Sequence, residues 1–324
     1  MTCTIKDVAK EAGVGLGTAS RVINHSGNVS KEAKQKVEAA IKKLGYTTNA
    51  SGLRLRSQKT GVIALLVPII EHPFFSKFCN YVEKAADEQG YSILLVLSQQ
   101  RIEKKSQILS QIRRKEVDGA ILLTHFNHDE TETKGLNIVT IDRHLGKDIP
   151  IVTSDNYEAT KKGVRYLYDK GCRKIVYLGT KAPVESEVNK RYQGYLDAVK
   201  ELGLEEQSIN EAILHGQEND PIAHFFEKCK DFDGIFASGY SITASLYAAL
   251  IEKGYKIPND VQIMSYDGDF TPKEFSPHFT CLDQPIEQLA KKAVEILMDK
   301  INGKKIKENI TYYNCTIKEG DTTK

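Results

Sequence analysis

The chain has no tryptophan, only three methionines, and no two cysteines close enough to form a Cys-x-x-Cys pair. A zinc site with the usual ligand spacing and a disulfide framework are therefore not predicted, and scattered cysteines are typical of reduced thiols in a cytoplasm. The eight histidines also lack metal-ligand spacing, so neither a metal nor a cofactor is expected. The cysteines are Cys3, Cys79, Cys172, Cys229, Cys281 and Cys315.

Long apolar runs are also missing. Residues 1–25 lack the unbroken apolar core of a secretory signal peptide, and no run approaches the roughly 18 residues that a membrane span needs. The sequence therefore predicts a soluble, cytoplasmic protein.

Motifs of catalysis and nucleotide binding are absent as well. The patterns G-x-S-x-G, H-E-x-x-H and the P-loop do not occur, so no enzyme and no catalytic residue is predicted. Gly13, Gly15 and Gly17 are close together. They lack the third glycine of a dinucleotide-binding motif and follow a helical pattern instead of a strand, which argues against a nucleotide site.

Positive charge is concentrated at one end of the chain. The formal net charge is only +2, but residues 1–60 hold eleven Lys and Arg against four Asp and Glu, a net charge of +7. The other residues carry a net charge of −5. So basic a segment is typical of polyanion binding, although a solvated basic helix face has the same composition.

The apolar spacing in this basic segment predicts three short helices. The first ends at Gly13, the second spans about 16–24, and the third lies between an N-cap at Ser30 and Gly45. A helix, a tight turn and a second helix form a helix-turn-helix, whose second helix can enter the major groove of DNA. A plain helical hairpin is the alternative, and the basic excess argues against it.

Beyond the polar, basic stretch 46–60, the pattern of apolar residues changes. Short continuous apolar runs now alternate with helix-length segments, which indicates parallel sheets covered on both faces. The pattern occurs twice, with helices expected at about 74–89 and 187–202, so two similar α/β lobes facing each other across a ligand-binding cleft are predicted. The apolar runs are 61–67, 91–97, 118–123, 137–142, 173–179, 233–238 and 261–266.

The motif TIKDVAKEAGV…TASRVIN, followed by VSKEAKQKVEAAIKKLGY and by TGVIALLVP…HPFF, resembles the LacI/GalR family of bacterial repressors. Later pieces occur in the family's order, among them R-x-x-G-Y at 191–195 and IPNDV at 257–261, and the likeness covers nearly the whole chain. The implied fold is a three-helix helix-turn-helix domain followed by a two-lobed α/β core with parallel sheets, like that of periplasmic binding proteins.

This resemblance implies a different function for each part of the chain. Residues 1–46 are expected to bind DNA, residues 47–60 to form a hinge, and residues 61–324 to bind an effector and form a homodimer or larger assembly. The implied function is repression of carbohydrate-utilisation genes, with release from operator DNA by a sugar or sugar phosphate. A sugar-binding transport protein shares the two-lobed fold, but the helix-turn-helix and the missing export signal argue against it.

The resemblance also indicates the residues that contact DNA. Arg21 can reach a guanine edge or a phosphate. Leu55 occupies the position of a hinge leucine that wedges into a minor-groove step of bent DNA, and Gly52, where the family usually has alanine, weakens the hinge helix by up to about 1 kcal/mol. The predicted DNA-binding residues are Thr4, Leu16, Gly17, Thr18, Ser20, Arg21, Asn24, Asn49 and Leu55.

Candidate effector residues follow from the same motifs. Pairs of Asp and Arg suit the vicinal hydroxyls of a sugar because charged groups form the stronger hydrogen bonds, although each residue can instead be an ordinary ion-pair partner. The family usually has Asn-Asp where this chain has Gly239 and Tyr240, and stacking by Tyr240 is expected to replace the missing polar contact. The predicted effector-binding residues are Phe75, Asp142, Arg143, Arg191, Tyr240 and Asp267.

Overall fold

The computed structural model describes residues 3–24, 26–46, 59–99, 101–123, 130–182, 184–212 and 219–324. The chain divides into two compact units, Met1–Lys59 and Thr60–Lys324. Among the helices in these ranges, none has the length and apolar character required to cross a membrane.

Three helices make up the N-terminal unit, as predicted: α1 (Ile5–Ala12), α2 (Leu16–Ile23) and α3 (Lys31–Leu44). Gly13 and Gly45 end α1 and α3 with φ angles of 65° and 58°, a left-handed conformation that glycine adopts without steric penalty. The Ser30 hydroxyl caps α3 by accepting a hydrogen bond from the Ala33 N–H at 3.3 Å. The small core between the helices contains Val8, Ala9, Ala12, Ala19, Val22, Val37 and Ala40.

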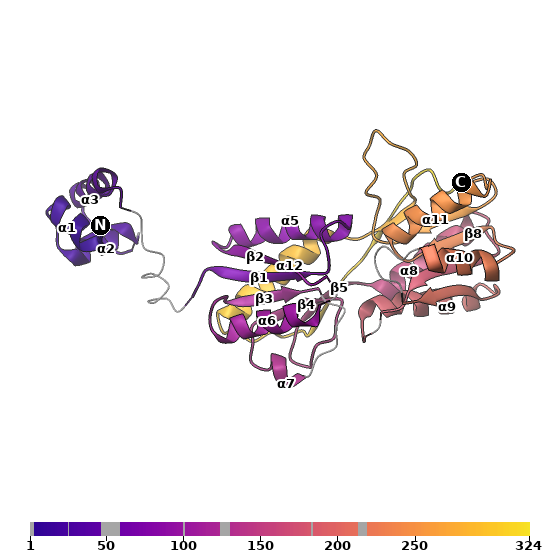
Figure 1. Ribbon diagram of the computed structural model, residues 1–324, viewed down its shortest axis with the longest axis horizontal. Coiled ribbons are helices and arrows are strands. Elements are labelled where there is room, and N and C mark those ends of the chain that lie inside the picture. The colour runs from indigo at the N-terminus through magenta and orange to yellow at the C-terminus, as the bar shows by residue number, and fades with distance from the viewer. Residues whose placement is uncertain are drawn as a thin grey trace. The chain divides into compact units, whose positions relative to one another are not determined.

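The second unit contains two six-stranded sheets with the same strand order, which confirms the prediction of two similar α/β lobes (Figure 1). Lobe 1 has the strand order β11-β5-β4-β3-β1-β2, and lobe 2 has the order β12-β10-β9-β8-β6-β7. All neighbouring strands are parallel except β10 and β12. The strands of lobe 1 are β1 (Val62–Val67), β2 (Ser92–Leu97), β3 (Gly119–Leu122), β4 (Ile138–Ile141), β5 (Ile151–Ser154) and β11 (Ile310–Tyr313). Those of lobe 2 are β6 (Ile175–Thr180), β7 (Gln207–Glu211), β8 (Gly234–Ala237), β9 (Gln262–Ser265), β10 (Cys281–Asp283) and β12 (Thr316–Lys318).

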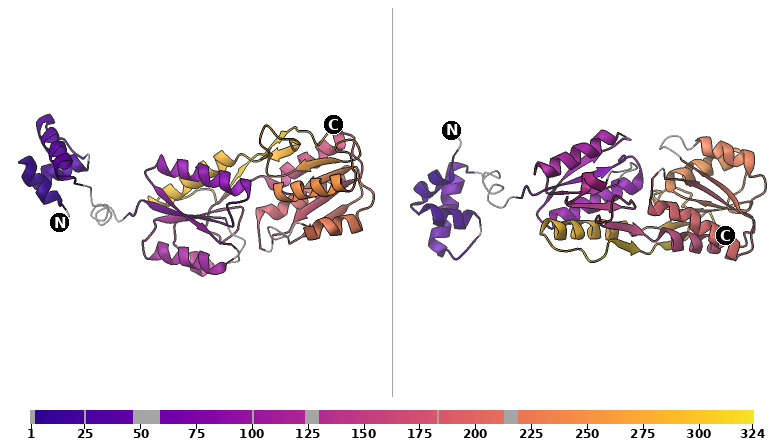
Figure 2. Two further views of the ribbon diagram at one scale, coloured as in Figure 1. Left: turned by 45° about the horizontal axis from the view of Figure 1, so that its top comes forward. Right: turned by 90° about the horizontal axis from the view of Figure 1, so that it is seen from below.

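Helices cover both faces of each sheet (Figure 2). In lobe 1, α5 (Pro73–Asp87) and α12 (Ile286–Ile301) pack on one face and α6 (Ile102–Arg113) on the other. In lobe 2, α8 (Asn156–Asp169) and α9 (Lys190–Glu201) cover one face, and α10 (Asn219–Lys228) and α11 (Tyr240–Glu252) cover the other. The short helix α7 (Glu130–Thr133) lies between β3 and β4 in the sequence. Apolar residues on both faces of every central strand explain the continuous apolar runs of the sequence.

The chain passes between the lobes three times: from β5 to α8, from β10 to α12 and from β11 to β12. As a result, α12 and β11 belong to lobe 1 although they come late in the sequence. Of the strands and helices of lobe 2, only β12 follows them. One boundary differs from the expected helix at 187–202, because Glu187–Asn189 is a separate 3-10 turn before α9. The Ser186 hydroxyl holds this turn by accepting a hydrogen bond from the Val188 N–H at 3.1 Å.

Candidate DNA-binding and effector sites

The beginning of α2 presents open space on the surface of the N-terminal unit. Gly15 is its N-cap. Leu16 follows with 47% of its surface exposed, and a Cβ added at Gly17 would meet nothing within 4 Å. A DNA backbone or a thymine methyl group can therefore approach this end of α2 closely, although Gly17 itself offers no side-chain hydrogen bond.

The polar residues of the predicted DNA site differ in how free their side chains are. Arg21 is exposed in the last turn of α2, whereas Thr18, near the start of the same helix, is half-buried. The Asn24 amide donates to the Ser20 hydroxyl at 3.1 Å, and the Thr4 hydroxyl donates to Asp7 at 2.7 Å. Arg21 therefore has the longest side chain that can reach DNA without giving up one of these local bonds. Asn49 and Leu55 lie outside the described residues.

Arg191 lies at the centre of the predicted effector residues, and it is almost completely buried. Its Nε donates to the Asn156 side-chain oxygen at 2.7 Å, and its Nη1 donates to the Ser238 carbonyl at 2.7 Å. Nη1 also lies 3.4 Å from Asp267 Oδ1, and the guanidinium lies 3.6 Å from the centre of the Tyr266 ring. Burial alone would lower the pKa of Arg191, but Asp267 and other neighbours raise it above its usual value. The group is thus fixed in position and charged.

One chain of hydrogen bonds runs from Arg191 to Asp142 of lobe 1. The Asn156 amide donates to the Thr153 hydroxyl at 3.2 Å, and this hydroxyl donates to Asp142 Oδ1 at 2.5 Å. Burial raises the pKa of the Asp142 carboxyl, although Thr153, Arg191 and Arg143 act in the opposite direction. Arg143 follows Asp142 and is also buried.

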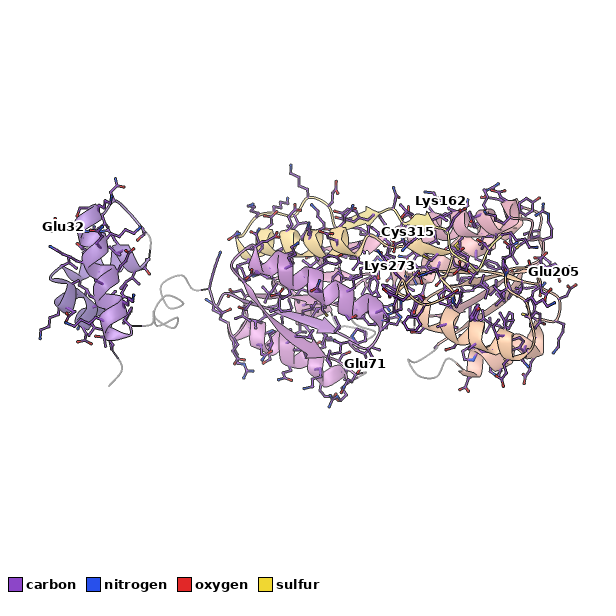
Figure 3. All side chains as sticks on the ribbon, turned by 90° about the horizontal axis from the view of Figure 1, so that it is seen from above. Glu32, Glu71, Lys162, Glu205, Lys273 and Cys315 are labelled. Carbon is purple, nitrogen blue, oxygen red and sulfur yellow. The ribbon has the colours of Figure 1, made fainter. Side chains whose placement is uncertain are left out.

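A second chain runs from Arg191 through Asp267 to the passage between the lobes. The Gln284 amide donates to Asp267 Oδ1 at 2.7 Å, and the Ser154 hydroxyl donates to Gln284 Oε1 at 2.6 Å. Ser154 and Gln284 stand at two of the three places where the chain passes between lobes. Figure 3 shows that Cys315, at the third passage, lies where the lobes meet. Arg191, Asp142 and Asp267 are thereby connected to the segments that join the two lobes.

Both aspartates have an unusual backbone. Asp142 has a φ of 61° and Asp267 a φ of 80°, in the left-handed region that residues other than Gly, Asn and Asp rarely adopt. Such strain tends to persist at functional sites. Each aspartate follows the carboxyl end of a parallel strand, β4 or β9, where α/β folds place their ligand sites.

The two aromatic candidates lie on different lobes. Phe75 is half-buried in α5 and packs against the core of lobe 1. Tyr240 begins α11, and its ring meets Phe270 and Phe279 edge-on at centroid distances of 5.2 and 5.9 Å. Tyr240 thus belongs to an aromatic cluster that contacts both lobes, since Phe270 also packs against the core of lobe 1. The hydrogen bonds described above for Arg191 include neither ring.

Sequence reasoning missed four residues of this network: Thr153, Ser154, Asn156 and Gln284. The residues follow or end β5 and β10, and a signal was present in the polar groups TSDN and DQ after short apolar segments. Predicting their role required knowing that β5 and β10 end at the same junction between lobes.

Comparison with known proteins adds independent information. Residues 4–49 match the family described as bacterial regulatory proteins, lacI family, and residues 60–318 match periplasmic binding proteins and sugar binding domain of LacI family. The chain is 34% identical to the ribose operon repressor of Halalkalibacterium halodurans, covering 93% of this chain and 91% of the relative.

Two solved structures show the likeness in three dimensions. A LacI-type regulator from Alkaliphilus metalliredigens complexed with D-xylulofuranose is 28% identical, with a TM-score of 0.73, and covers 81% of this chain and 99% of that one. The lac repressor dimer bound to operator and the anti-inducer ONPF has a TM-score of 0.85 at 19% identity, and 99% of each chain is covered. The second likeness concerns the fold alone.

Proposed function

Because this chain belongs to the LacI family of bacterial regulatory proteins, we propose that it represses carbohydrate-utilisation genes and leaves its operator when a sugar binds between its lobes. The chain is a DNA-binding transcriptional regulator and not an enzyme. In the proposed organisation, residues 1–46 bind DNA, residues 47–60 form the hinge, and residues 61–324 bind the effector and dimerise. The proposed place of action is the cytoplasm.

The observation that carries the proposal is the network around Arg191. Asp142 and Asp267, both with a left-handed backbone, lie there with the buried side chains of Arg191 and Arg143, so charged groups of both lobes are close together. Such groups suit vicinal hydroxyls, and their balanced charge favours a neutral sugar over a sugar phosphate, which would bring unpaired negative charge. The ribose repressor and the D-xylulofuranose complex among the relatives support a pentose as the first ligand to test.

Two measurements test this function. Mobility shift on promoter DNA measures operator binding by the full-length protein. Pentoses, hexoses and their phosphates are then screened for a rise in melting temperature, because a ligand at 100 times its Kd stabilises the native state by about 2.7 kcal/mol. We expect the sugar that raises the melting temperature to release the DNA. A protein that binds no promoter DNA, or that no sugar stabilises, would contradict the proposal.

Mutation of Arg21 separates base contacts from general attraction. We expect Arg21→Ala to weaken operator binding by about 1–3 kcal/mol, since one good base-edge contact has that strength, without lowering the melting temperature, because the side chain is exposed. The control is Lys43→Ala, which removes a charge that pairs with Glu11 at 2.7 Å. The affinities of Arg21→Ala for operator DNA and for random DNA are compared by mobility shift. An equal loss of affinity for both DNAs would show that Arg21 contacts a phosphate and not a base edge.

The β2 edge of lobe 1 supports the proposed homodimer. Leu94 and Leu95 on this edge strand are 36% and 40% exposed. They line a groove of about 380 Å³ between β2 and α6. Exposed apolar edge strands promote association, and a symmetric dimer covers the same surface on both subunits.

We expect Leu95→Glu to dissociate the dimer, because a two-fold interface places two carboxylates near each other in an apolar contact. Sedimentation equilibrium should then give a mass near 36.3 kDa, and operator affinity should fall by about tenfold or more as the two half-sites lose their linkage. Ile251→Glu, on the exposed surface of α11, serves as the control and should leave the dimer intact. A dimeric Leu95→Glu protein would place the interface elsewhere.

A further inference from the structure

Glu187 is a completely buried carboxylate with three donors around it. His144 Nε2 lies 2.7 Å from Oε1, Lys190 Nζ lies 2.7 Å from Oε2, and the Tyr312 hydroxyl donates to Oε2 at 3.1 Å. The exposed fraction of the Glu187 side chain is 0%. Burial favours its protonated form, but the bonds from Lys190, His144 and Tyr312 outweigh this effect and hold the pKa of Glu187 below its usual value.

The donors come from both lobes. Glu187 and Lys190 belong to lobe 2, in the turn before α9 and at its start. His144 follows β4 and Tyr312 lies on β11, both in lobe 1. The carboxylate of one lobe is therefore held by two side chains of the other.

The backbone around Glu187 also joins the lobes. The Glu187 N–H donates to the Asp142 carbonyl at 2.9 Å, and the Ser186 hydroxyl donates to the same oxygen at 2.9 Å. Arg143 and Ser186 form an isolated antiparallel bridge. This contact directly adjoins Asp142, the aspartate of the candidate effector site.

Moving the lobes apart at this point would break the bonds from His144 and Tyr312 or expose them to water. A buried carboxylate that loses a donor is strongly disfavoured, whereas the same carboxylate with all donors present is stable. We therefore expect two distinct arrangements of this contact, engaged and separated, instead of a continuous range. Bistable contacts of this kind are what convert a small ligand-induced movement into a switch.

We propose that Glu187 is an interlobe latch, whose engagement with His144 and Tyr312 fixes the lobe arrangement to which the effector binds. The effect on effector affinity rests on the proposed function, whereas the contact between the two lobes does not. Because the latch stabilises the arrangement in which Asp142 and Arg191 are joined, it contributes to effector affinity without touching the ligand. Glu187 and Tyr312 are positioning residues in this sense, and their coupling to the ligand must be reciprocal.

The latch predicts a measurable loss in two variants, one on each lobe. Glu187→Gln removes the charge at almost constant shape, and Tyr312→Phe removes one donor from an exposed side chain. Hydrogen exchange of the full-length protein reports the lobe contact through the backbone amide of residue 187, which is bonded across the lobes. We expect this amide to exchange about tenfold faster in each variant, because the opening that exposes it becomes more favourable.

Matched controls keep the same chemistry within one lobe. Glu201→Gln removes a carboxylate that pairs with Lys161 at 2.6 Å, and Tyr166→Phe removes a hydroxyl bonded to Glu319 at 2.7 Å. Both pairs lie in lobe 2, so exchange at residue 187 should stay at the wild-type rate. If Glu187→Gln folds poorly, Tyr312→Phe decides the test. This substitution is in lobe 1, and the amide whose exchange is measured is in lobe 2.

Two results would overturn the latch. Unchanged exchange at residue 187 in Tyr312→Phe would show that the cluster does not hold the lobes together, whatever the effector is. Faster exchange with an unchanged Kd for the stabilising sugar would show that the contact is not coupled to ligand binding. The expected result is a Kd weakened by about tenfold in Tyr312→Phe and by up to about a hundredfold in Glu187→Gln. Absence of any stabilising sugar would contradict the proposed function and leave the exchange result to decide the latch.

Discussion

A fragment that begins at Thr60 is expected to fold and to lose roughly a thousandfold or more in DNA affinity. It contains the whole compact unit Thr60–Lys324 with the cores of both lobes. It carries a net charge of −5, whereas residues 1–60 carry +7. Because neutralisation of phosphates by Lys and Arg supplies most non-specific affinity, the fragment should repel DNA. Mobility shift at several salt concentrations measures the loss.

The full-length protein is the reference for this fragment. Its affinity should fall steeply between about 50 and 200 mM salt, as counterion release requires, while circular dichroism and the sugar-induced melting shift of the fragment should resemble those of the parent. A fragment that still shifts operator DNA would place the DNA-binding surface on the lobes and contradict the assignment.

Replacing Asp267 with alanine should abolish release by the effector while operator binding remains. The carboxylate accepts from Gln284 at 2.7 Å and lies 3.4 Å from Arg191, so its loss breaks the connection between Arg191 and Gln284. Loss of a charged hydrogen-bonding partner in a buried site weakens the ligand by about 2–5 kcal/mol, a factor of roughly 30 or more. Mobility shift with increasing sugar measures the response.

Two further variants serve as controls for Asp267→Ala. Asp267→Asn retains a side chain that tolerates the φ of 80°, so it separates the missing charge from backbone strain. Asp197→Asn, whose carboxylate accepts from Tyr157 at 2.7 Å on the surface of lobe 2, should respond to sugar as the parent does. Normal release in Asp267→Ala would remove this residue from the site, and tighter DNA binding on adding sugar would reverse the sign of the mechanism.

The helices and strands were predictable because they depend on local spacing. Gly13 and Gly45 end helices where expected, and the continuous apolar run at 61–67 is β1 within one residue. The position of Arg191 followed from a motif. In each case, neighbours in the sequence carry the information, through helical periodicity or through burial on both faces of a strand.

The partners of these residues were not predictable in the same way. Ser154 and Gln284 are 130 residues apart, and only the passage of the chain between the lobes brings them together. Tyr240 was expected to stack on the ligand, and its edge-on contacts with Phe270 and Phe279 depend on a loop with no periodic pattern. Side-chain networks of this kind depend on contacts between segments far apart in the chain, which local sequence patterns do not specify.

The triple passage between the lobes has a consequence for synthesis on the ribosome. Lobe 1 receives α12 and β11 from residues 286–313, after the ribosome has made nearly all of lobe 2. Until then, one face of its sheet lacks one of the two helices that cover it, and the apolar residues that pack against Leu289, Ala293 and Leu297 are exposed. Unfinished chains with such surfaces are prone to aggregate. Lobe 1, which the ribosome begins first, is therefore expected to keep apolar surface exposed until nearly the whole chain has been made.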